Sequence, residues 1–155
     1  LGVPKETLRE AIPALTALDH RMSVVPSTDG RVWVNDSKST NVDSTLAALR
    51  GRREPTVLLL GGQWKGGGFD ALVPHLTPVH TVICFGANGH DIAAELESAG
   101  VTALLAGDLE GAVQLARFRA NPGDHVLLSP GCASFDAFEN FEHRGRAFAR
   151  LAGEG

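Results

Sequence analysis

The sequence predicts an α/β protein with an open, mostly parallel, doubly wound sheet, one antiparallel strand and helices on both faces. Strand-like and helix-like segments alternate along most of the chain, which is typical of βαβ units. Strand-like segments such as "TVLLL" and "TVICF" are apolar on both faces, which indicates burial between two helical layers. With 155 residues, 43% of them apolar, the chain is large enough for one buried core.

The first elements differ from the rest of the chain. Residues 5–15 have apolar side chains at helical spacing, and Pro13 is expected to end or kink this helix. The segments "RMSVV" and "RVWV" favour strands, and they flank a turn with Asp29 and Gly30, a pair typical of β-hairpins. This hairpin accounts for the expected antiparallel strand.

After the hairpin, strands and helices alternate. The expected strands are residues 56–60, 81–85, 102–105 and 126–128. The expected helices are residues 44–50, 90–98, 109–119 and 135–151. Parallel strands joined by right-handed crossovers bind ligands beyond their carboxyl ends, so a site is expected in the loops that follow the strands.

Composition argues against several classes of function. The formal charge is −4 with acids and bases interleaved, which favours neither nucleic acid nor a membrane surface as a partner. Cys84 and Cys132 are far apart in sequence and form no CxxC pair, which favours reduced, buried thiols in a cytoplasmic protein. The sequence begins without Met and without a signal-peptide pattern, so we expect a piece of a longer protein.

Two of the loops after expected strands have unusual chemistry. The first, "NDSKSTN" at 35–41, combines Asp36, Lys38 and hydroxyls near a helix start, where backbone N–H groups favour anions. The second, "GGQWKGGGF" at 61–69, has Lys65 as its only charge among five glycines, which let a ligand approach the backbone. This second loop matches neither a P-loop nor a dinucleotide-binding fingerprint.

The third loop, "SPGCASFDAFENF" at 129–141, begins with a Pro-Gly turn. We expect it to start the last helix, with Ser134 as the N-cap and Asp136 in the first turn. Phe135 and Phe141 would then lie close enough to the helix start to line a pocket.

Together the three loops suit a small anionic ligand, because they offer lysines, hydroxyls and helix N-termini. They include no evident nucleophile, His-based dyad or carboxylate pair, and the six histidines show no metal-binding spacing. Each loop could also be an ordinary solvent-exposed turn. The residues alone therefore predict an anion-binding domain, with a stand-alone nucleotide- or small-anion-binding module of Rossmann type as the alternative.

The same loops resemble the Mur ligase family. "NDSKSTN" is close to N-D-S-K-A-T-N, and "GGQWKGGGF" is similar to G-G-x-x-K-G-x-D-F. "SPGCASFDAFENFEHRGRAFARL" is similar to S-P-A-C-A-S-F-D-x-F-x-N-F-x-x-R-G-x-x-F, and His20 with Arg21 resembles a pair that opens the same domain. The first motif resembles the branch that adds D-glutamate, and it disfavours the related folylpolyglutamate synthetase type.

The resemblance implies one domain of a monomeric, three-domain cytoplasmic ligase of peptidoglycan synthesis. Residues 18–155 would be its Rossmann-like C-terminal domain, which binds the incoming D-glutamate, and residues 1–17 a remnant of the central domain's last helix and linker. ATP and Mg²⁺, bound mainly by the other domains, would activate the carboxylate of UDP-N-acetylmuramoyl-L-alanine as an acyl phosphate. The D-glutamate amine would then form an amide, so this piece alone should be inactive.

The resemblance also assigns roles to residues at matching positions. The positions that hold D-glutamate match Lys65, Thr40, Ser134, Phe135 and Phe141. Arg21 and Asp36 match positions that contact the nucleotide, and Lys38 matches a catalytic lysine near the reacting phosphate. No residue is expected to bind a metal. Gly68 departs from the pattern, because an acid often precedes Phe69 in the family, and this puts the rigidity of the glycine-rich loop in question.

Overall fold

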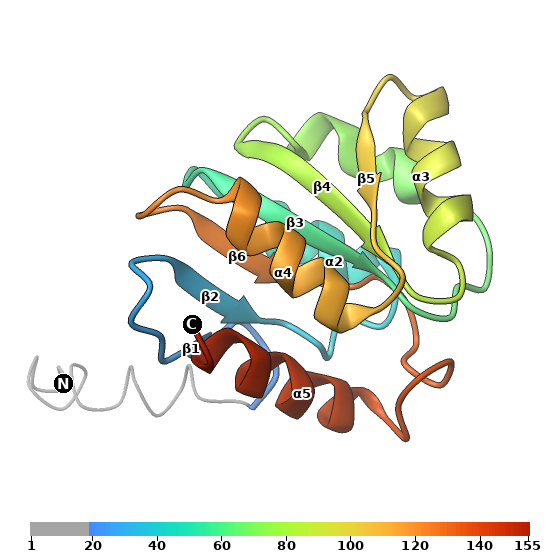
Figure 1. The fold of residues 1–155 in the computed structure, drawn as a ribbon. Coiled ribbons are helices and arrows are strands. Elements are labelled where there is room, and N and C mark those ends of the chain that lie inside the picture. The colour runs from blue at the N-terminus through green and yellow to red at the C-terminus, as the bar shows by residue number, and fades with distance from the viewer. Residues whose placement is uncertain (1–18) are drawn as a thin grey trace, which may run out of the picture.

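The computed structural model describes residues 19–155, and Figure 1 shows their fold. The helix expected at residues 5–15 and the domain boundary expected after residue 17 lie outside the described residues. Within residues 19–155, six strands form one sheet in the order β1-β2-β6-β3-β4-β5. The β1–β2 pair is antiparallel and the other four pairs are parallel, which confirms the expected sheet and hairpin.

Strands and helices alternate along the chain as expected. The strands are β1 (Ser23–Val25), β2 (Val32–Asn35), β3 (Thr56–Gly61), β4 (Val79–Phe85), β5 (Ala103–Leu105) and β6 (His125–Leu128). The helices are α2 (Val42–Leu49), α3 (Gly89–Ser98), α4 (Leu109–Arg119) and α5 (Phe141–Gly153), together with a 3₁₀ helix, η1 (Phe69–His75). None of these helices has the length and apolar character needed to cross a membrane.

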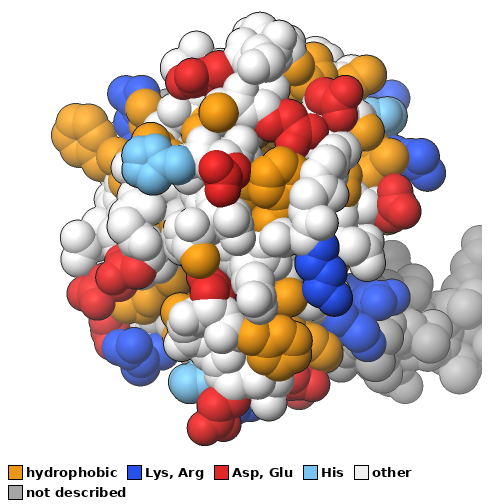
Figure 2. Space-filling model, turned by 90° about the vertical axis from the view of Figure 1, so that its right-hand side faces the viewer, with side chains coloured by type: hydrophobic (Ala, Val, Ile, Leu, Met, Phe, Trp, Pro, Cys, Tyr) orange, Lys and Arg blue, Asp and Glu red, His pale blue; other side chains and the backbone are white. Residues whose placement is uncertain are grey.

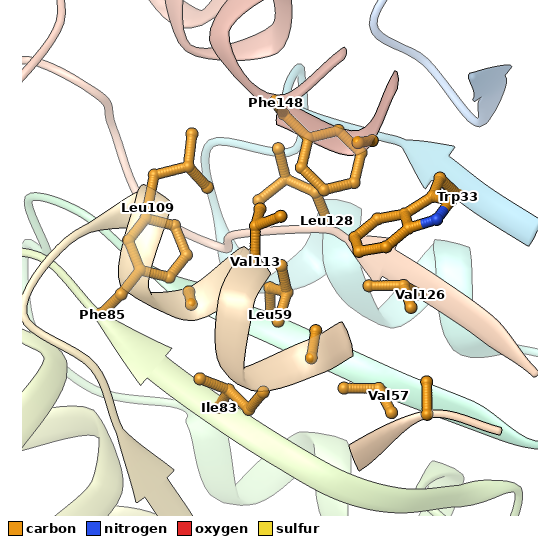
Figure 3. Close-up of a cluster of buried hydrophobic side chains, with 14 of the residues drawn as sticks. Trp33, Val57, Leu59, Ile83, Phe85, Leu109, Val113, Val126, Leu128 and Phe148 are labelled. Atoms are coloured by element: carbon orange, nitrogen blue, oxygen red, sulfur yellow. The ribbon is translucent and has the colours of Figure 1, made fainter. Parts of the chain in front are cut away.

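Helices cover both faces of the sheet. Side chains of α2, η1 and α3 pack on one face, and those of α4 and α5 pack on the other. On the second face, the rings of Trp33 and Phe148 lie 5.9 Å apart beside Leu128 (Figure 3). Every residue of β3 is buried, so its continuous apolar run does reflect burial between two layers. Each large apolar side chain buried in this way contributes about 1.5–3 kcal/mol.

The expected start of the last helix is wrong. Helix α5 begins at Phe141 rather than at residue 135, and its N-cap is Asn140. The Asn140 side chain accepts a hydrogen bond of 2.8 Å from the backbone N–H of His143, the bond expected of an N-cap. Ser134 is therefore not the cap of this helix.

A loop takes the place of the expected first turns. The carbonyl of Ser134 accepts hydrogen bonds from the backbone N–H groups of Ala137 and Phe138, which closes a local turn. The Asp136 carboxylate accepts a 3.0 Å hydrogen bond from the N–H of Ala87, in the loop after β4. This tertiary partner explains why Asp136 does not lie in a first helical turn.

Candidate functional site

A cavity of about 790 Å³ lies at the carboxyl edge of the sheet, where the loops after β2, β3 and β6 meet. Because β6 lies between β2 and β3, the third loop lies between the first two. Five residues predicted to hold one ligand all line this cavity: Thr40, Lys65, Ser134, Phe135 and Phe141. The structure therefore brings together side chains that are up to 101 positions apart, from Thr40 to Phe141.

The cavity has positive and amide groups that suit an anion. Among its lining residues, all within the described part of the chain, Lys65 is the sole basic side chain. The starts of α2 and α5, at Asn41 and Asn140, also line it, and helix N-termini favour negative charge. Two acidic side chains, Asp43 in the first turn of α2 and Glu142 in the first turn of α5, also line the cavity and would attract an amine. This set fits a small molecule with both carboxylate and ammonium groups.

The lining residues show no nucleophile prepared for covalent chemistry. Cys132 lines the cavity, but burial raises the pKa of its thiol to about 12, so it is protonated near neutral pH. Within residues 19–155, no three His, Cys, Asp or Glu side chains gather where they could hold a metal ion.

Phe135 and Phe141 differ in how they face the cavity. Phe135 is 69% exposed at the rim, while Phe141 is half-buried at the start of α5. The Lys38 ammonium lies 6.0 Å from the centre of the Phe141 ring. Lys38 does not line the cavity but is next to it, at the edge expected to face the reacting groups.

Asp36, predicted to contact a nucleotide, lies outside the cavity and is buried. Its Oδ2 accepts hydrogen bonds from the hydroxyls of Ser39 and Ser129, and its Oδ1 accepts one from the N–H of Met22 at 3.3 Å. Burial raises the pKa of the Asp36 carboxyl, and the bonds from Ser39 and Ser129 oppose this only in part. Asp36 therefore joins three segments of the chain at the base of the first loop.

Arg21, the other residue predicted to contact a nucleotide, is exposed and also lies outside the cavity. Its neighbours His20 and Met22 have φ of 64° and 50°, a left-handed conformation that costs such residues about 1–2 kcal/mol. The structure holds this bend in place, because the carbonyl of His20 accepts a bond from the N–H of Lys38 at 3.0 Å. Arg21 therefore lies on a strained bend that is hydrogen-bonded to the first loop.

Arg144 is a residue that the sequence reasoning did not single out. It is fully buried in α5, and its Nε and Nη2 donate to the hydroxyl and the carbonyl of Ser37 at 3.0 and 2.9 Å. Its Nη1 has no partner within the described residues, and burial lowers the pKa of Arg144 to about 10. Arg144 ties the last helix to the first loop. Its place in the R-G pair of the third motif was the available signal.

Surface charge at this side of the molecule is mixed. Figure 2 shows basic, acidic and hydrophobic side chains interspersed on the face turned to the viewer. This pattern agrees with the formal charge of −4 and the interleaved acids and bases of the sequence.

The sequence of this chain is similar to that of known ligases. Residues 20–132 match the family described as Mur ligase, glutamate ligase domain. The chain is 48% identical to the UDP-N-acetylmuramoylalanine--D-glutamate ligase of Rubrobacter xylanophilus, with 99% of this chain and 35% of that protein covered. It is 45% identical to the enzyme of the same name from Escherichia coli O6:H1, with the same two coverages. The chain thus spans about a third of the length of these relatives.

Solved structures with the same fold are more distant in sequence. A bifunctional folylpolyglutamate synthase/dihydrofolate synthase from Yersinia pestis matches with a TM-score of 0.65 and 20% identity, over 97% of this chain and 35% of that one. A second structure of this kind, complexed with AMPPNP and a Mn ion, matches with a TM-score of 0.60 and 20% identity, over the same shares. At this identity the likeness concerns the fold.

Proposed function

This chain belongs to the Mur ligase family, and on that premise we propose that it is the D-glutamate-binding, C-terminal domain of a cytoplasmic ligase. The full enzyme would join D-glutamate to UDP-N-acetylmuramoyl-L-alanine at the expense of ATP, a step of peptidoglycan synthesis. Residues 18–155 would form this domain, with residues 1–17 left from the preceding one. We propose that the enzyme acts as a monomer.

One observation carries the proposal. The five residues that match the family's D-glutamate positions line a single cavity with one lysine, two helix N-termini and two acidic side chains. D-Glutamate has two carboxylates and one ammonium group. Lys65 and the helix N-termini would hold the carboxylates, since charge-assisted bonds to carboxylates are about twice as strong as neutral ones.

The position of the cavity agrees with a reaction between domains. Lys38 and Arg21 are exposed and lie outside the cavity, on the loop and bend that would face a nucleotide held elsewhere, and the buried Asp36 holds that bend through the N–H of Met22. The described residues gather no three metal-ligating side chains, and Mg²⁺ in nucleotide sites commonly binds through one or two carboxylates and the phosphates. In line with the family resemblance, we assign ATP and Mg²⁺ mainly to the other domains, and to this chain the task of orienting the amine that attacks the activated carboxyl group.

The proposal predicts a selective effect of Lys65→Ala in the full-length enzyme. A charge-assisted bond to a carboxylate contributes about 1.5–3 kcal/mol, so the KM for D-glutamate should rise roughly 10- to 100-fold. The KM for ATP should stay within about twofold, because Lys65 would not bind the nucleotide. Steady-state release of ADP, with D-glutamate and ATP varied separately, measures both constants.

Arg50→Ala is the matched control, because Arg50 is an exposed cation outside the cavity. It should change neither KM. An unchanged KM for D-glutamate in Lys65→Ala, or equal turnover of L-glutamate by the wild-type enzyme, would rule the assignment out. The coding sequence upstream of Leu1 should also contain a GxxxxGK[ST] motif, and its absence would favour a stand-alone anion-binding module.

A further inference from the structure

The glycine-rich loop has no side-chain cap of its own where it enters η1. Gly66, Gly67 and Gly68 have φ of 100°, 74° and 98°, so all three adopt the left-handed conformation that glycine tolerates best. Gly68 is the N-cap residue of η1 and has no side chain to accept a bond from the first N–H groups of the helix. Unsatisfied N–H groups here would leave the loop loosely held.

A carboxylate from another helix supplies the missing acceptor. Glu95 of α3 is half-buried, and its Oε1 accepts hydrogen bonds from the N–H of Gly68 at 2.9 Å and of Asp70 at 3.3 Å. The N–H of Asp70 is a group that an N-cap side chain would satisfy, and the N–H of Gly68 is the one that the acidic partner of a capping box would satisfy. Glu95 thus provides from α3 the negative charge that the family motif often has in the loop itself, at the position of Gly68.

The other end of the loop is also fixed. Gln63 and Ala133 exchange two backbone hydrogen bonds of 2.8 and 3.1 Å, and the N–H of Trp64 donates to the Asn88 side chain at 3.0 Å. The Trp64 ring packs edge-on against Phe69, with 5.7 Å between ring centres. Lys65 therefore lies on a span of three residues between two anchored points.

We propose that Glu95 is a positioning residue for Lys65. Its carboxylate fixes Gly68, and through it the short span that presents the lysine to the cavity. This inference rests on the proposed function, since it assigns Lys65 to D-glutamate. It adds a residue that lies 30 positions from Lys65, on a helix outside the three loops.

Two substitutions in the full-length enzyme separate positioning from general stability. Glu95→Ala removes the acceptor and should raise the KM for D-glutamate roughly 10-fold, with the KM for ATP within about twofold. Glu95→Gln keeps an acceptor oxygen at the same place and should restore the KM for D-glutamate to within about threefold of the wild-type value. Glu97→Ala, an exposed acid on the same helix, is the control and should behave as the wild type.

Amide hydrogen exchange of the peptide that covers residues 61–70 gives a readout that does not depend on activity. Exchange should quicken in Glu95→Ala and remain as in the wild type in Glu95→Gln and Glu97→Ala. Unchanged exchange in Glu95→Ala, or an equal rise of both KM values, would overturn the inference. If the wild-type enzyme did not use D-glutamate, the proposed function would fail, and the exchange data would still decide whether Glu95 anchors the loop.

Discussion

At the scale of single residues, Gly145 of α5 leaves room for the ring of His20. A Cβ at position 145 would lie 2.7 Å from Cγ and 2.8 Å from Cε1 of that ring, closer than real contacts allow. The ring is held at this place by Asn35, whose Nδ2 lies 3.2 Å from the ring Nδ1 and donates to the carbonyl of Gly145 at 2.9 Å. Gly145 therefore determines where the bend around Arg21 can sit against α5.

This contact predicts that replacing Gly145 by alanine lowers the stability of the protein. Alanine inside a helix normally stabilises by about 1 kcal/mol relative to glycine. Gly145→Ala should instead destabilise the protein by about 1–3 kcal/mol, since overpacking forces the neighbouring ring to move. Urea unfolding at neutral pH measures the difference. Gly107→Ala is the control, because a Cβ there meets nothing within 4 Å, and an equal loss of stability in both variants would contradict this account.

Residues of short polar loops that line the cavity could be predicted from the sequence, whereas residues whose contacts depend on distant hydrogen-bond partners could not. Lys65 and Thr40 stood out in the sequence because charge and hydroxyls cluster in short loops. Glu95 and Arg144 did not, because one acid or one arginine in a helix usually faces solvent, and their partners lie at least 25 positions away. Burial and hydrogen bonds, rather than composition, give these two their roles.

At the scale of secondary-structure elements, Asp29 joins the hairpin to the ends of two helices. Its carboxylate accepts bonds from Arg117 of α4 at 2.8 Å and from the Trp33 indole at 3.0 Å. Arg117 also donates to the carbonyl of Leu151 at 2.7 Å, near the end of α5, and its guanidinium lies 4.8 Å from the Trp33 ring centre. Asp29 also forms an ion pair with Arg31 at 3.3 Å, and through Arg117 it links α4 and α5 to the hairpin and β2.

The pH dependence of stability should reveal this junction. Burial pushes the pKa of Asp29 up, but hydrogen bonds from the Arg31 backbone and the Trp33 indole outweigh it, so the folded-state pKa is lowered. The ionised carboxylate therefore stabilises the fold above the ordinary aspartate pKa of about 4, and this contribution is lost as the pH falls through the lower folded-state value. Asp29→Asn should be less stable than the wild type by about 1–3 kcal/mol at pH 7.

Comparing the stability of wild type and Asp29→Asn at low pH tests whether the charge of Asp29 causes the difference. As the pH falls from the ordinary aspartate pKa through the lowered folded-state pKa, the wild-type carboxyl gains a proton, so the difference in unfolding free energy between wild type and Asp29→Asn should shrink. Urea titrations at pH 7 and at pH 2.5 measure it. A gap that stays constant between the two pH values would show that Asp29 acts through packing rather than charge.

Elements with strong patterns were predictable, and elements defined by tertiary contacts were not. The strands and the helices α3 and α4 appear close to their expected residues, because their apolar spacing is regular. The 3₁₀ helix η1 was missed, since it follows three glycines and contains Pro74, both of which indicate a loop. The start of α5 was misplaced because Asp136 bonds to Ala87 in another loop.

At the scale of the whole molecule, the order of the strands in the sheet could not be predicted from the sequence. The place of β6 between β2 and β3 brings the third loop between the first two, although it follows them by dozens of residues in the chain. The general rule that ligands bind beyond the carboxyl ends of parallel strands predicted the edge. It could not predict which loops are neighbours, because strands of similar apolar composition can pair in several orders.

The two cysteines offer a test of how the molecule opens as a whole. Cys84 at the end of β4 and Cys132 after β6 belong to the same core layer, under α2, η1 and α3. The pKa of each thiol is raised to about 12, in both cases mainly by burial, and for Cys84 the proximity of Cys132 contributes to the same rise. At pH 8 only about one thiol in 10⁴ would be ionised, and both side chains are covered by protein.

Both thiols should therefore resist a disulfide reagent in native buffer at pH 8 and react together once urea unfolds the chain. Labelling should proceed at least 10³-fold more slowly than that of a free cysteine, because it needs opening of the shared core layer. Mass spectrometry of the labelled protein should show zero or two labels, with few singly labelled molecules, if β4 and β6 open as one unit. Rapid labelling of one thiol in native buffer would show instead that the cavity wall around Cys132 opens separately from the sheet.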